Sequence, residues 1–149
     1  MIISKVVLAG LLIIAASEDL IRRRIPNYLI ASGLIAFASE ASWLLYRDQL
    51  ALTGNLLAGG AAFILYVIPY IAGAMGAGDV KLAFIIGLIL GWESWTRYMS
   101  VFCVLSTLVS IGALIYRKEK KRAIPLAPVM AVAYLTGLCY NGLENVLFH

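Results

Sequence analysis

Long apolar runs separated by short polar connections most restrict what this chain of 149 residues can fold into. Hydrophobic residues make up 62% of the sequence and charged residues only 13%, against about 25% charged residues in a typical soluble domain. An apolar run of about 20 residues can cross a bilayer as a helix. We therefore predict an all-α, polytopic transmembrane bundle that forms a single domain over residues 1–149, with no soluble domain attached.

The apolar runs predict six helices. Pro26 suits the first turn of the second helix, where its missing N–H leaves no intrahelical hydrogen bond unmade. The fourth predicted helix is the shortest. The expected bounds are roughly Ile2–Ser17, Pro26–Tyr46, Ala51–Gly73, Val80–Trp92, Tyr98–Tyr116 and Leu126–Leu147.

The basic residues indicate the orientation of these helices. The first, third and fifth connections share one side and hold nine of the 12 basic residues, whereas the other side holds Lys5, Arg47 and Arg97. Because cytoplasmic loops of membrane proteins are enriched in Lys and Arg, we predict a multi-pass protein of the cell membrane with both termini outside. The net charge of +4 then reflects orientation and does not indicate a nucleic-acid partner.

Two aspartates at the ends of apolar runs are candidates for function, because charges near the membrane interior are costly. Asp19 closes the first predicted helix and Asp79 opens the fourth. The fourth helix is about 20 Å long, shorter than a hydrocarbon core of about 30 Å, so Asp79 should lie below the cytoplasmic interface. The first helix places Asp19 at a similar depth, where the two carboxylates could meet. Geometry alone leaves open that each aspartate caps a helix or pairs with a basic residue.

Three short motifs accompany these aspartates. Gly76-Ala77-Gly78-Asp79 reads GxGD and is followed by Lys81. Asp19 precedes the basic run Arg22–Arg24, after which comes Ile25-Pro26-Asn27. The stretch Ile124–Pro128 reads IPLAP and follows the last basic loop.

In this order the motifs resemble the prepilin peptidase family, including the archaeal preflagellin peptidases, which shows an Asp before a basic stretch and IPN, then GxGDxK, then IPxxP. The resemblance implies a membrane aspartic endopeptidase that cuts the basic leader from type IV prepilin-like precursors, of pilin or archaellin type, at the cytoplasmic face. Its catalytic aspartates correspond to Asp19 and Asp79. The chain looks like the short form of the family, without the insert of paired CxxC motifs found in methylating members.

The chemistry of two close carboxylates fits this resemblance. A shared proton supplies one base to activate water and one acid to protonate the leaving amine. No cofactor is therefore expected, and no His or Cys spacing indicates a metal site. The expected partners are the precursor substrate and the lipid bilayer.

Five further residues are expected to shape the site or contact the substrate: Pro26, Asn27, Gly76, Gly78 and Lys81. The glycines allow close approach of a backbone. Lys81 either favours a charge on Asp79 or anchors its helix at the headgroups, and Asn27 is expected to order the loop. The alternative function is a small ion- or proton-coupled transporter, in which charges near the midplane and an internal repeat are expected; the sequence shows neither.

Overall fold

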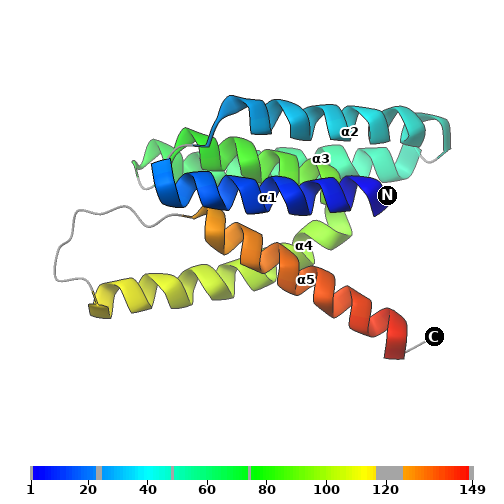
Figure 1. Cartoon of the computed structure of the whole chain (residues 1–149). Helices are drawn as coiled ribbons and strands as arrows, with labels where there is room; N and C mark the ends of the chain where they lie inside the picture. The colour runs from blue at the N-terminus through cyan, green and yellow to red at the C-terminus, as the bar shows by residue number, and fades with distance from the viewer. Residues whose placement is uncertain (1, 23–24, 48, 74, 117–125, 148–149) are drawn as a thin grey trace.

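The computed structural model describes residues 2–22, 25–47, 49–73, 75–116 and 126–147. These residues form five helices and no strand, which confirms the all-α class (Figure 1). The helices are α1 (Ile2–Arg22), α2 (Asn27–Arg47), α3 (Gln49–Ile71), α4 (Ala77–Tyr116) and α5 (Ala127–Leu147).

The helix α4 joins the predicted fourth and fifth helices across a kink, so the count of six separate helices is not confirmed. Its 40 residues include both the predicted fourth and fifth helices, interrupted at Gly91, where φ is 72° and ψ is 169°. Only glycine adopts such a φ at little cost, so one residue reverses the chain and no loop is needed. Glu93 and Arg97, predicted in that loop, form an i,i+4 ion pair of 2.8 Å on the helix after the break.

Two other helix boundaries differ from the prediction. The first helix continues beyond Ser17 to Arg22, so Asp19 lies within its last turn. The second helix begins at Asn27, one residue after Pro26, whose carbonyl accepts a hydrogen bond of 3.2 Å from the amide of Leu29. Pro26 therefore stands immediately before the helix, because a proline needs no hydrogen-bond acceptor for its own nitrogen at that point.

Several helix ends that carry candidate site residues lie at one end of the bundle. Figure 1 shows the C-terminal ends of α1, α3 and α4 at the same end of the bundle as the N-terminal ends of α2, α4 and α5. The two chain termini and the reversal inside α4 lie at the other end. The first, third and fifth connections of the sequence prediction therefore leave the helices at one common end of the molecule.

The core is built around the pairing of α3 with α4, the most extensive helix contact among the described residues. Small residues allow this contact: a Cβ on Gly87 would come within 2.6 Å of the carbonyl oxygen of Ala58. The helix α5 packs across α1 and α4. The largest fully buried side chains of the described core are Leu8, Leu12, Ile85, Ile86 and Met130.

The outer faces of the helices carry many exposed large apolar side chains, among them Ile13, Ile35, Leu57 and Ile64. Within the described residues, α2 and α3 are long and apolar enough to cross a membrane. An apolar exterior of this extent would be costly in water, whereas lipid tails solvate it at little cost.

Candidate active site

Asp19 lies in the last turn of α1 and is buried, with 9% of its surface exposed. Its Oδ2 atom accepts a hydrogen bond of 3.3 Å from the backbone amide of Ala127, the first residue of α5. The first N–H groups of a helix have no acceptor within the helix, so the carboxylate satisfies one of them. The positive end of the α5 dipole also favours a negative charge on Asp19.

Asp79 lies in the first turn of α4 and is half-buried. Its Oδ2 atom accepts a hydrogen bond of 3.2 Å from the backbone amide of Gly76, just before the helix. A Cβ on Gly76 would stand 3.3 Å from this same oxygen, so the glycine keeps the approach open. The other oxygen, Oδ1, is buried and has no hydrogen-bond partner among the described residues. One oxygen of the carboxylate is thus hydrogen-bonded to the backbone, and the other can still accept a hydrogen bond.

The structure brings Asp19 and Asp79 together. They come from different helices that end and begin at the same end of the bundle, and their carboxyl groups are close enough to repel each other electrostatically. Both carboxylates face the N-terminus of a helix, which reduces the cost of holding two acidic groups together. Such a pair favours a state in which one carboxyl keeps its proton and the other is ionised.

The IPN motif packs directly against the GxGDxK motif. A Cβ on Gly78 would lie 2.9 Å from the Cβ of Ile25, so only glycine leaves room for this contact. The Lys81 ammonium donates a hydrogen bond of 3.3 Å to Oδ1 of Asn27 at the start of α2. These contacts hold the start of α2 beside the start of α4. They give Asn27, Gly78 and Lys81 a structural role next to the two aspartates.

Sequence reasoning did not assign two groups near the aspartates. The Ala127 amide belongs to the IPLAP stretch, which was singled out but not connected with Asp19. Tyr66 of α3 is 3% exposed and lies close enough to Asp79 for the two groups to interact electrostatically. A tyrosine inside an apolar run gave no sequence signal. Several positions named from the sequence lie outside the described residues: Arg23, Arg24, the loop 117–122 with its five basic residues, Ile124 and Pro125.

The described residues contain no group of three or more His, Cys, Asp or Glu side chains that could hold a metal ion. What the site does contain is a pair of carboxyl groups at the end of a helical bundle. Such a pair can provide one base and one acid to the same reaction.

Comparison with known proteins identifies the family. Residues 6–117 match the type IV leader peptidase family. The chain is also 32% identical over 139 residues to a prepilin leader peptidase/N-methyltransferase of Bacillus subtilis (strain 168), an alignment that covers 91% of this chain and 55% of that protein. The chain therefore spans about half the length of this curated relative. No solved structure matches it significantly. The chain belongs to the type IV leader peptidase family.

Proposed function

We propose that this protein is an aspartic endopeptidase of the cell membrane that removes the basic leader peptide from type IV prepilin-like precursors. The observation that carries the proposal is the proximity of Asp19 and Asp79, contributed by separate helices at one end of the bundle. Membership of the leader peptidase family supports the substrate class and favours a peptidase over a transporter.

The proposed reaction needs only the two carboxyl groups and water. The ionised carboxylate takes a proton from a water molecule as the water oxygen attacks the scissile carbonyl carbon. The protonated carboxyl of the other aspartate supports the carbonyl oxygen and then gives its proton to the leaving amine nitrogen as the C–N bond breaks. The two residues titrate as a coupled pair, so the roles of acid and base belong to the pair.

The proposed topology places the aspartate end of the bundle at the cytoplasmic face, within a single peptidase domain over residues 1–149. The support is the concentration of basic residues in the first, third and fifth connections, whose helix ends gather beside Asp19 and Asp79. The exposed apolar side chains on the outer helix faces support a position in the bilayer. Both termini are then on the outer side.

This position suits a substrate that has a basic leader followed by an apolar helix. The leader would remain in the cytoplasm, where anionic headgroups attract each Lys or Arg by about 1 kcal/mol. The apolar helix would pack against the peptidase within the bilayer. Because a helical peptide bond is hydrogen-bonded and shielded, the cleavage segment must be extended when it reaches the two carboxyl groups.

The test is co-expression of this chain with a candidate prepilin, followed by gel electrophoresis and N-terminal sequencing of the product. We expect a shortened precursor whose new N-terminus lies at the boundary between leader and apolar helix. The matched control is the double variant Asp19→Asn and Asp79→Asn, which should leave the precursor intact. Processing by the double variant at the rate of the natural chain would show that the two aspartates are not the catalytic groups.

A further inference from the structure

The buried face of α3 leads directly to the candidate site. Its buried residues, Asn55, Ala58, Gly59, Ala62 and Tyr66, recur every three or four residues, apart from the adjacent Ala58 and Gly59, and form one stripe. The first four have small or short side chains. Tyr66 is the large residue at the end of the stripe and carries a buried hydroxyl.

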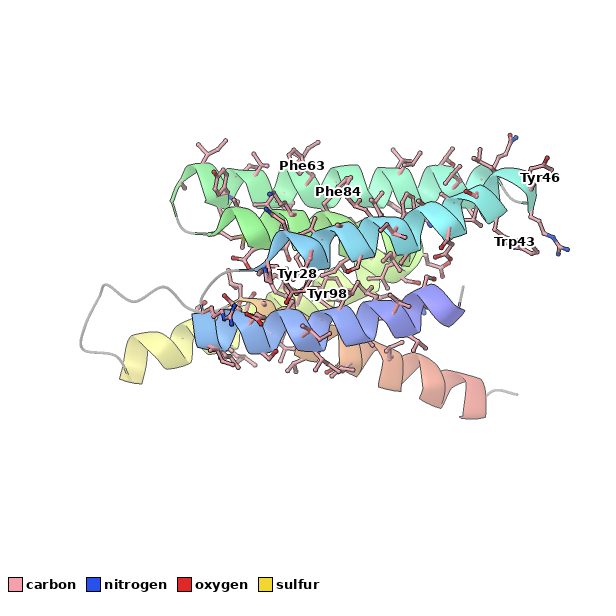
Figure 2. All side chains as sticks on the ribbon, turned by 45° about the horizontal axis from the view of Figure 1, so that its top comes forward. Tyr28, Trp43, Tyr46, Phe63, Phe84 and Tyr98 are labelled. Atoms are coloured by element: carbon pink, nitrogen blue, oxygen red, sulfur yellow. The ribbon has the colours of Figure 1, made fainter. Side chains whose placement is uncertain are left out.

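The contacts between α3 and α4 fix the position of Tyr66 relative to Asp79 along the helix axes. The rings of Phe63 and Phe84 meet edge to face, with centroids 6.1 Å apart (Figure 2). One turn further from the site, a Cβ on Gly59 would collide with the side chain of Leu88. In two antiparallel helices each step forward along one matches a step back along the other. Continuing this register from Phe63 places Tyr66 level with the residues around Asp79.

The hydrogen bonds at this level are incomplete. The Tyr66 hydroxyl has a sulfur acceptor, the Sδ atom of Met99, at 3.8 Å. A thioether sulfur is a weak acceptor. The Oδ1 atom of Asp79 is buried and has no hydrogen-bond partner among the described residues. Tyr66, a donor with a weak acceptor, and Asp79, an acceptor with no donor among the described residues, therefore lie within about one turn of each other along the contact between α3 and α4.

We propose that Tyr66 is a positioning residue of the aspartate pair, and that its phenol donates the hydrogen bond that Oδ1 of Asp79 lacks. The backbone amide of Gly76, in the connection between α3 and α4, already donates a hydrogen bond to Oδ2 of Asp79. Tyr66 would hold Oδ1 from the interior, so that the carboxylate has one orientation toward Asp19 and the attacking water. Hydrogen bonds to charged groups are stronger than those between neutral groups. The Tyr66 hydroxyl would therefore leave the sulfur of Met99 and donate to the Asp79 carboxylate when bound substrate orders the site.

The ring of Tyr66 packs independently of its hydroxyl. Its centroid lies 5.8 Å from that of Phe102, and the ring is enclosed between α3 and the second part of α4. Tyr66→Phe therefore keeps the apolar packing and removes only the donor. Tyr98→Phe is a matched control, because the Tyr98 hydroxyl is buried without a hydrogen-bond partner among the described residues. Tyr134→Phe is a second control, since that hydroxyl donates to the Lys5 carbonyl at 2.8 Å.

The inference rests on the proposed function, and its experiment uses the full chain with a prepilin substrate in detergent or vesicles. For Tyr66→Phe we expect kcat to fall about tenfold or more with KM within about twofold, as for loss of a hydrogen bond to a charged group. The acidic limb of the pH–rate profile should also move to higher pH, because the phenol no longer stabilises the carboxylate. Tyr98→Phe and Tyr134→Phe should keep the rate and the profile of the natural chain.

A second variant separates the two partners of the Tyr66 hydroxyl. Met99→Leu removes the sulfur acceptor and leaves the phenol free to face Asp79, so cleavage should be kept or increased. Loss of cleavage in Met99→Leu equal to that in Tyr66→Phe, at equal amounts of folded protein, would overturn the inference. So would an unchanged kcat and pH profile in Tyr66→Phe. In both cases loss of cleavage in Asp79→Asn would leave the proposed function standing, whereas a natural chain that cleaves no prepilin would overturn both.

Discussion

Gly78 and Ile25 join the two motifs that sequence analysis singled out. A Cβ on Gly78 would lie 2.9 Å from the Cβ of Ile25 and 3.4 Å from its Cγ1. The contact places the residues before α2 against the first turn of α4, where Asp79 lies. The glycine was expected to allow close approach of a neighbouring helix or of the substrate backbone. In the structure its lack of a side chain allows approach of the protein's own chain.

Gly78→Val should therefore reduce leader cleavage about tenfold or more, because the start of α2 must move away from α4 and overpacking typically costs about 1–3 kcal/mol. The amount of protein in the membrane should change much less. Gly10→Ala is the control, since nothing lies within 4 Å of a Cβ at that position. The measurement compares cleavage per amount of folded protein, and an equal rate in Gly78→Val would contradict the role of this contact.

Asp19→Asn and Asp79→Asn should each abolish leader cleavage, because the amide of Asn neither accepts a proton from water nor donates one as a carboxyl does. Each variant should still reach the membrane, since Asn keeps the size of the side chain. Cleavage is measured by the gel shift of a co-expressed prepilin. Glu18→Gln is the control, because the half-buried Glu18 pairs with Arg22 at 3.4 Å within α1 and should be dispensable. Near-normal cleavage by either Asn variant would remove the aspartate pair from the mechanism.

Cleavage should continue without added metal and in the presence of a chelator. The physical reason is that two carboxyl groups supply both the acid and the base of peptide hydrolysis. The measurement is the rate of prepilin processing by purified protein before and after treatment with a strong chelator. A loss of activity that zinc restores would show that the proposed chemistry is wrong.

Gly87→Ala should destabilise the bundle, because the added Cβ would come within 2.6 Å of the Ala58 carbonyl oxygen and force α3 away from α4. We expect a loss of about 1–3 kcal/mol in the free energy of unfolding. Thermal unfolding in detergent measures it. Gly60→Ala is the matched control on the neighbouring helix, since nothing lies within 4 Å of its Cβ and replacement of a helical glycine gains up to about 1 kcal/mol. Equal melting temperatures for both variants would show that the close contact is unimportant.

A truncated substrate tests the docking of the precursor in the bilayer. We expect a peptide with the leader and the scissile bond, but without the apolar helix, to be cleaved at least about tenfold less efficiently than the full precursor. Burial of an apolar helix against the peptidase contributes binding that the truncated peptide loses. The comparison is kcat/KM for both substrates under the same conditions. Equal values would mean that docking within the bilayer contributes little.

Local features of the sequence were enough to predict the helical class. The apolar runs that give α2 and α3 depend on composition and on backbone hydrogen bonds within each run, so their approximate positions could be read directly. The predicted helix boundaries were less accurate than the helix positions. The first helix was expected to end at about Ser17, with Asp19 closing it, but α1 continues to Arg22 because nothing local stops the helix at Ser17. The reversal at Gly91 was read as a loop, since a positive φ leaves no mark beyond the glycine itself.

The sequence by itself determined which residues could form the site. Asp19, the GxGD motif that ends at Asp79 and the IPN motif were all identifiable from residue type, spacing and their place at the ends of apolar runs. The tertiary structure decided their partners. The amide that binds Asp19 comes from Ala127, 108 residues away along the chain, and the hydroxyl proposed to support Asp79 comes from Tyr66. The physical reason is that helix formation depends on neighbours along the chain, whereas these partners depend on how α5 packs on α1 and α3 on α4.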